Sequence, residues 1–231
     1  MARERQTRPN AHPGATRSSD AIQYPRTPPA HLFVLSGPAG IGKTTLCENL
    51  IAADEALSRV ITATTRSPRE GEVNGRDYHF LTVEEFLQRR KTDAFYETAE
   101  VHGLGRYYGT LRDEVDSRLQ AGQDLLLNID VQGADAFRQA AQHNPDLARR
   151  LVSIFILPAS LDDLKKRLQG RGSEDPAEIQ RRLGTAKAEM RRWPEYDYCV
   201  VSGSPEADLR RVQAIVTAYR LRVMRGAGTL L

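Results

Sequence analysis

Apolar runs alternate with helical patterns along the chain from residue 30 onward. Runs that are polar only at their ends are typical of parallel strands buried on both faces. Apolar residues at four-residue intervals from Leu111 to Leu119, and at three-four spacing from Leu209 to Val223, predict helices. The alternation predicts an α/β fold in which helices wrap a parallel sheet. The expected strands are His31 to Ser36, Asp124 to Asp130, Leu151 to Leu157 and Tyr198 to Val201.

Two stretches interrupt this alternation. Residues 64–110 are polar and glycine-containing, and they combine short β-like pieces with one helical run, VEEFLQRRK. Residues 170–176, GRGSEDP, read as a loop between two arginine-rich helical segments. We therefore expect a core formed by residues 31–63, 111–169 and 193–228, with an inserted β-rich subdomain at 64–110 and a lid at 170–192.

Composition fits one core domain with inserted pieces: the chain has 231 residues, of which 40% are apolar. Its 33 basic and 30 acidic residues nearly balance, giving a net charge of +3. Residues 1–30 are rich in Arg, Pro, Ser and Ala and have almost no apolar periodicity. This favours a disordered, mobile extension over a nucleic-acid-binding arm or an organelle transit sequence.

The sequence has no run of eighteen apolar residues and no apolar signal segment, so we expect a cytoplasmic protein with no membrane partner. Because basic and acidic residues nearly balance, we also expect no nucleic-acid partner. Cys47 and Cys199 lie in apolar segments without a CxxC pattern, and we expect both to be reduced core residues. We expect a monomer or a weak homo-oligomer.

A glycine-rich loop after the first expected strand is the strongest local motif. The sequence GPAGIGKT matches the P-loop pattern GxxxxGK[ST] and precedes a helical pattern. Its glycines let backbone N–H groups face phosphate oxygens, Lys43 can reach the β and γ phosphates, and the Thr44 hydroxyl can bind Mg²⁺. A plain glycine turn is the alternative. The residues predicted to bind ATP are Gly37, Pro38, Ala39, Gly40, Ile41, Gly42, Lys43, Thr44 and Thr45.

Residues 64–80, TTRSPREGEVNGRDYHF, closely resemble the monophosphate-binding signature of guanylate kinases, and the resemblance continues nearly to the end of the chain. It implies a P-loop NTPase fold with a small GMP-binding subdomain and a lid. Arg66 and Arg69 stand three residues apart and Tyr78 follows nine later, so two guanidinium groups and a phenol can converge on the GMP phosphate. The alternative is two surface arginines and a tyrosine ring in the core.

Guanine presents N1–H and N2–H₂ donors beside an O6 acceptor, so its site needs a carboxylate and a hydroxyl. Glu97, which follows an aromatic pair, and Thr110, which closes RYYGT, match the family's base-reading acidic residue and its Tyr-Gly-Ser/Thr element. Adenine would turn a lone pair toward the carboxylate and leave a buried charge unpaired. The resemblance completes the GMP-binding set with Thr62, Tyr108, Gly109 and Asp130.

Asp130 follows an apolar run at the carboxyl edge of the expected sheet, where such folds bind ligands. The resemblance places it between the two nucleotides, near the water ligands of Mg²⁺. A role as the N-cap of the next helix is the alternative, and the two roles can coexist. Asn128 stands where many relatives have an acidic residue, and we assign it no catalytic role.

Residues 164–183, LKKRLQGRGSEDPAEIQRRL, resemble the family's lid. Arg167, Arg171 and Arg182 match its arginines, which can stabilise charge on a transferring phosphoryl group; a solvated helix face is the alternative. Near the C-terminus, Ser202 and Gly203 replace the family's Asn-Asp pair beside the adenine. An adenine contact by Ser202 is therefore not predicted, and donor selectivity stays open.

The resemblance implies phosphorylation of GMP, and of dGMP, by Mg²⁺-ATP, with Lys43, Arg167, Arg171 and Arg182 as catalytic residues. Two alternatives remain. The loop from Glu97 to Tyr108 is slightly longer than usual and contains a His-Gly-Leu element found in relatives that phosphorylate a ribose bisphosphate. A catalytically silent binding module is disfavoured, because the P-loop lysine and the lid arginines are all present.

Overall fold

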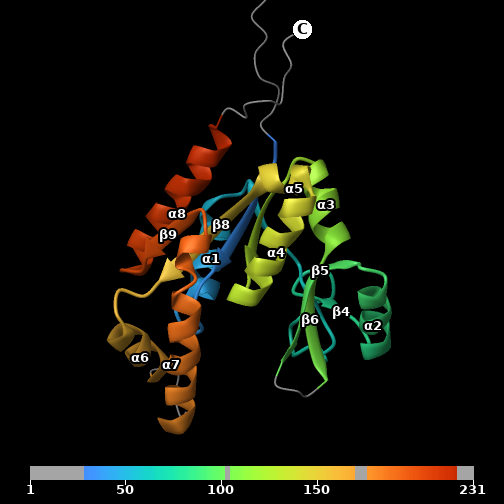
Figure 1. The fold of residues 1–231 in the computed structure, drawn as a ribbon. Helices are drawn as coiled ribbons and strands as arrows, with labels where there is room; N and C mark the ends of the chain where they lie inside the picture. Colours follow the sequence, from blue (N-terminus) through green and yellow to red (C-terminus); the bar gives the residue numbers. More distant parts are fainter. Residues whose placement is uncertain (1–28, 102–104, 170–175, 223–231) are drawn as a thin grey trace, which may run out of the picture.

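The computed structural model describes residues 29–101, 105–169 and 176–222, and within these ranges its centre is a five-stranded parallel sheet (Figure 1). Its strands are β1 (Leu32–Ser36), β2 (Leu57–Arg59), β7 (Asp124–Asn128), β8 (Leu151–Leu157) and β9 (Tyr198–Val201). They lie in the order β2-β7-β1-β8-β9. The four strands expected from the apolar runs are confirmed, and β2 is an edge strand that the sequence analysis did not identify.

Helices cover both faces of this sheet (Figure 1). They are α1 (Lys43–Ala53), α3 (Arg112–Gln120), α4 (Val131–His143), α5 (Pro145–Arg150) and α8 (Pro205–Arg220). Because successive strand residues point to opposite faces, Leu32 and Val34 of β1 pack with α3, α4 and α5, whereas Phe33 and Leu35 pack with α1 and α8. The predicted α/β class is confirmed. None of the helices in the described ranges combines the length and apolar content needed to cross a membrane.

Some boundaries differ from the sequence-based expectation. β7 ends at Asn128, because the Asp130 carboxylate accepts the backbone N–H of Gly133 at 2.8 Å and caps α4. Ala30, assigned to the N-terminal extension, is buried in the core; residues 1–28 and 223–228 lie outside the described ranges. Cys47 is buried as expected, whereas Cys199 is exposed, so the expectation of a core residue was wrong there.

A second, smaller sheet interrupts the main fold between β2 and α3. Its strands are β3 (Ala63–Thr64), β4 (His79–Phe80), β5 (Phe95–Val101) and β6 (Arg106–Leu111), in the order β4-β3-β6-β5. β3 and β4 are parallel, and the other pairs are antiparallel. Helix α2 (Val83–Lys91) begins at a capping box in which Thr82 and Glu85 exchange hydrogen bonds. The predicted β-rich insertion is therefore present.

The core of the second sheet centres on Phe86, which is fully buried. Its ring stacks on Phe95 at a centroid distance of 4.5 Å and on Tyr107 at 5.5 Å. We expect Phe86→Ala to lower the free energy of unfolding by about 3–5 kcal/mol, because the variant loses buried apolar area and leaves a cavity. Urea unfolding followed by circular dichroism measures this, with exposed Val73→Ala as the control. Equal losses in the two variants would contradict the packing assigned to Phe86.

Aromatic and polar contacts fix the second sheet to the main body. Tyr96 of β5 stacks on Phe137 of α4 with ring centroids 4.7 Å apart, and its hydroxyl donates to Asp116 of α3 at 2.5 Å. Helices α6 (Leu161–Gln169) and α7 (Pro176–Met190) lie at the carboxyl edge of the main sheet, on the opposite side from the second sheet (Figure 1). The two helices share a hydrophobic cluster. The lid predicted at 170–192 includes α7, and its residues 170–175 lie outside the described ranges.

Candidate active site

The glycine-rich loop 37–42 connects β1 to α1 at the carboxyl edge of the main sheet. Gly37, Gly40 and Gly42 have positive φ angles, and a Cβ on Gly37 would collide with the carbonyl oxygen of Ile156. Gly42 is the N-cap of α1 and provides no side-chain cap. The N–H groups of the first turn can therefore face an anion.

Lys43 and Thr44 open helix α1 beside this loop. The Lys43 ammonium donates to the carbonyl oxygens of Gly37 at 2.6 Å and Pro38 at 3.1 Å. Its charge therefore lies over the loop that would hold phosphates. The Asn128 amide at the end of β7 donates to Thr44 Oγ1 at 3.2 Å. Asn128 thus orients the hydroxyl predicted to bind Mg²⁺, a contact that the sequence analysis did not anticipate.

One carboxylate organises the predicted phosphate-binding residues of the second sheet. Glu72 accepts two 2.6 Å hydrogen bonds from the Arg66 guanidinium and one of 2.7 Å from the Arg69 backbone N–H. The hydrogen bonds from Arg66 lower the pKa of Glu72 to about 2, and the same pairing raises the pKa of Arg66. Arg66 also lies over the Tyr78 ring, 4.8 Å from its centroid, and Tyr78 contacts Tyr108 edge to face. These predicted residues therefore gather in one place.

Glu97 and Thr110 face each other across β5 and β6. The buried Thr110 hydroxyl donates to Glu97 Oε1 at 2.7 Å. Burial raises the pKa of Glu97 to about 7, with a smaller contribution from the negative charge of Asp130 and an opposing one from the Thr110 hydrogen bond. A Cβ on Gly109 would lie 2.8 Å from the Glu97 carbonyl oxygen, so only glycine allows this close strand pairing. The predicted base-reading pair is thus in direct contact.

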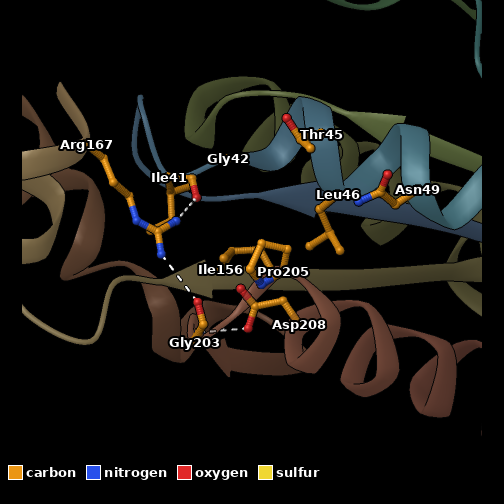
Figure 2. A pocket seen from close by; sticks show the side chains of 10 residues that line it. All are labelled: Ile41, Gly42, Thr45, Leu46, Asn49, Ile156, Arg167, Gly203, Pro205 and Asp208. Atoms are coloured by element: carbon orange, nitrogen blue, oxygen red, sulfur yellow. Dashed lines mark hydrogen bonds between the residues drawn. The ribbon is translucent and has the colours of Figure 1, made fainter. Parts of the chain in front are cut away.

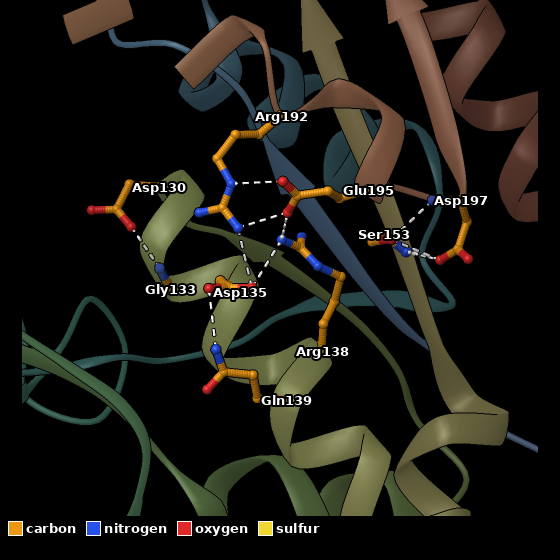
Figure 3. Close-up of polar contacts among 9 residues, drawn as sticks. All are labelled: Asp130, Gly133, Asp135, Arg138, Gln139, Ser153, Arg192, Glu195 and Asp197. Atoms are coloured by element: carbon orange, nitrogen blue, oxygen red, sulfur yellow. Dashed lines mark hydrogen bonds and ion pairs between the residues drawn. The ribbon is translucent and has the colours of Figure 1, made fainter. Parts of the chain in front are cut away.

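Asp130 is exposed at the N-terminus of α4 (Figure 3). Helix α4 packs against β5 through Phe137 and Tyr96, and the negative charge of Asp130 contributes to the raised pKa of Glu97. Thr62 precedes β3, and its carbonyl oxygen accepts the backbone N–H of His79 at 2.9 Å. No side-chain hydrogen bond of Thr62 occurs in the described parts of the chain.

Further along α4, charged side chains bind the segment that follows α7 (Figure 3). Arg192 pairs with Asp135 at 3.2 Å and with Glu195 at 2.6 Å, and Arg138 pairs with the same two carboxylates. Glu195 belongs to the short 3₁₀ helix η1 (Trp193–Glu195). Helix α4 therefore follows Asp130 directly and, through Asp135 and Arg138, binds the segment that follows α7.

Arg167 extends from α6 to the glycine-rich loop. Its Nη1 donates to the Ile41 carbonyl oxygen at 2.7 Å, and its Nη2 donates to Ser202 Oγ at 3.2 Å. Arg171 lies outside the described residues. The structure therefore shows Arg167, one of the predicted lid arginines, in contact with the glycine-rich loop.

Helix α7 contacts the same loop through Glu189, which sequence reasoning missed. Burial raises the pKa of Glu189, and the charge of Lys43 and the nearby backbone N–H of Ala39 oppose that rise. Its Oε2 is buried without a hydrogen-bond partner among the described residues. Arg182 lies seven residues earlier, about two turns of helix, and so shares this face of α7.

Comparisons with known proteins agree on one family. The guanylate kinase family profile matches residues 30–219. The guanylate kinase of Paramagnetospirillum magneticum is 42% identical over 197 residues, which are 85% of this chain and 88% of that protein. The chain belongs to the guanylate kinase family. The guanylate kinase of Rhizobium meliloti is 43% identical over 197 residues, covering 85% and 86% of the two chains. The crystal structure of guanylate kinase from Anaplasma phagocytophilum has a TM-score of 0.65 and 29% identity, covering 88% of this chain and 92% of that one.

Glu72 and Glu189, two acidic residues of the candidate active site, were not identified from the sequence. Glu72 lies three residues after Arg69 inside the family signature, so the motif itself contained a signal for it. Glu189 lies 150 residues from Ala39 in sequence, and no local pattern connects them. Both are carboxylates that contact a predicted phosphate-binding element.

Proposed function

We propose that this chain transfers the γ-phosphoryl group of ATP to GMP, giving ADP and GDP, and accepts dGMP in the same way. The strongest support is the contact between Glu97 and Thr110 at one end of a site that also contains the Arg66 cluster. The P-loop lies near the start of α4, because Asn128, two residues before Asp130, donates a hydrogen bond to Thr44 of the P-loop. We assign the reaction to the cytoplasm and to a monomer or weak homo-oligomer that acts on small molecules, not on nucleic acid or membranes.

GMP would be recognised at both of its ends. Ionised Glu97 accepts the guanine N1–H and N2–H₂, and Thr110 orients that carboxylate through its own hydrogen bond. The exposed edge of the cluster formed by Arg66, Arg69 and Tyr78 binds the phosphate, with Tyr108 beside it. AMP would be rejected because adenine leaves the buried carboxylate without donors.

Phosphoryl transfer needs no general base here, because the attacking oxygen belongs to a phosphate already ionised at neutral pH. One P–O bond forms to the GMP phosphate while the bond between the γ phosphorus and its bridging oxygen breaks. Lys43, Arg167 and Arg182 neutralise charge on the transferring group, and Arg171 joins them by resemblance. Closure of α6 and α7 would exclude water and so suppress ATP hydrolysis.

The polar groups near the loop fit Mg²⁺ carried by the nucleotide. Thr44 offers a hydroxyl oxygen and Asp130 a carboxylate, the latter through water, and hard oxygen ligands suit this ion. In the part of the chain that the structure describes, no cluster of three or more His, Cys, Asp or Glu could hold a metal alone. When bound, Mg²⁺ would neutralise charge on the phosphate oxygens.

The deciding experiment is a coupled ADP-release assay with Mg²⁺-ATP and the acceptors GMP, dGMP, AMP, UMP and ribose bisphosphate. Turnover with GMP and dGMP, and at least about a hundredfold lower kcat/KM with AMP and UMP, is the expected result. Turnover with ribose bisphosphate alone would overturn the proposal in favour of a sugar-phosphate kinase. GMP binding without turnover would identify a binding module.

We expect Glu72→Ala to raise the KM for GMP about tenfold and to leave the KM for ATP unchanged. The reason is that Arg66 loses the two hydrogen bonds that fix its guanidinium near the phosphate. Glu72→Gln keeps one acceptor oxygen and should have a smaller effect. Exposed Glu70→Ala is the matched control, and steady-state kinetics with both substrates provides the comparison. A similar KM in all three variants would show that Arg66 needs no positioning partner.

A further inference from the structure

A hollow of about 220 Å³ lies between the glycine-rich loop, α1 and the start of α8 (Figure 2). Typical small-molecule pockets measure about 300–1,000 Å³, so this hollow suits one part of a nucleotide. Gly42 and Thr45 form the side nearest the phosphate-binding loop, and its apolar walls are Ile41, Leu46, Ile156 and Pro205. Apolar walls beside a phosphate site suit the base of the same nucleotide.

The polar side chains at the strand-end side of this hollow already bind one another. The Ser202 hydroxyl is buried, donates to Asp208 Oδ2 at 2.7 Å and accepts from Arg167 at 3.2 Å. Asp208 Oδ1 accepts the Gly203 backbone N–H at 2.8 Å and an Arg211 contact at 3.4 Å. The Ser202 hydroxyl proton and both Asp208 carboxylate oxygens are therefore already engaged in hydrogen bonds within the protein.

Asn49 lines the hollow from the opposite side, on α1 (Figure 2). It is exposed and makes no hydrogen bond with any residue in the described ranges. It lies four residues after Thr45, one helical turn further from the phosphate loop on the same face of α1. Its amide combines one acceptor and one donor group, which complement the N6 amino group and N7 of adenine. Guanine presents two acceptors at the corresponding positions, O6 and N7, and so fits the amide less well.

We propose that Asn49 reads the base of the phosphoryl donor, accepting from the N6 amino group of adenine and donating to N7. The base lies between the apolar walls of the hollow. The planar Arg167 guanidinium, held by hydrogen bonds to Ile41 and Ser202, lies at the edge of the base. This inference rests on the proposed function. It assigns donor selectivity to α1, because the strand-end residues are committed to their own hydrogen bonds.

The test compares ATP with two analogues that each lack one recognised group: 7-deaza-ATP, without N7, and purine riboside triphosphate, without the amino group. With saturating GMP, the wild type should lose about three- to tenfold in kcat/KM with each analogue, the range for one neutral hydrogen bond. In Asn49→Ala the three donors should differ less than twofold, and the KM for GMP should be unchanged. Glu48→Ala, an exposed neighbour outside the hollow, should retain the wild-type preferences.

Two kinetic outcomes would overturn the proposal: equal use of the three donors by the wild type, or an equal loss with all donors in Asn49→Ala, which indicates packing alone. Isothermal titration of the same nucleotides, without GMP, separates this inference from the proposed function. If no acceptor is phosphorylated, the proposed function fails, and a wild-type preference for ATP that Asn49→Ala abolishes would still support the base contact. Equal affinities, or no binding of any of the three nucleotides, would refute it.

Discussion

Lys43→Met is expected to reduce kcat by about a thousandfold. The substitution keeps most of the side-chain length but removes the charge that lies over the phosphate loop, where it donates to Gly37 and Pro38. Removing one preorganised group that stabilises transition-state charge typically costs about a hundred- to a thousandfold in kcat. Phosphoryl transfer depends almost entirely on such positioning and charge, so we expect the upper end of this range.

The measurement is steady-state ADP release at saturating ATP and GMP, with exposed Lys91→Met as the control for loss of a lysine. Lys43 also contacts the loop carbonyls, so the fold and the GMP affinity of the variant have to be compared with those of the wild type by circular dichroism and isothermal titration. We expect both to be unchanged, because the predicted GMP-binding residues lie on the second sheet and α4. A loss below tenfold in a folded variant would mean that Lys43 does not act on the transferring group.

Much of the main sheet could be predicted because each buried strand is a continuous apolar run. All five residues of β1 are buried, and so are the five middle residues of β8. β2 was missed because it has three residues, of which only Leu57 is buried. β3 and β4 have two residues each, which is too short to produce a period. Their places depend on pairing with distant segments.

The phosphate loop was predictable because its residues are consecutive and their chemistry is local. The residues that orient it come from elsewhere: Asn128 contacts Thr44, and Glu189 contacts Ala39. The sequence showed that Ser202 departs from the family pattern, but not that Asp208 holds its hydroxyl. Sequence patterns identify groups that act as a local unit, whereas contacts between distant elements require the fold.

Glu97→Gln is expected to lower kcat/KM for GMP about a hundredfold, with little change in the KM for ATP. The carboxylate can accept both guanine donors, whereas the glutamine amide has one acceptor and presents its own N–H groups to the other donor. Hydrogen bonds to charged groups contribute about 1.5–3 kcal/mol, which agrees with a loss of this size. The preference for GMP over AMP should fall as well, because the buried charge that adenine leaves unpaired is removed. Unchanged selectivity would show that another residue reads the base.

The same residue should make GMP recognition dependent on pH. Burial raises the pKa of Glu97 from 4.5 to about 7 in the free protein, so Glu97 is mainly protonated below that pH and mainly ionised above it. Only the ionised form accepts both guanine donors, so kcat/KM for GMP should rise with pH to a plateau above 7 and be about tenfold lower at pH 6. The phosphate of GMP also titrates in this range, but it does so equally for both enzymes. The ratio of wild-type to Glu97→Gln kcat/KM therefore isolates the carboxylate, and a ratio independent of pH would contradict its role.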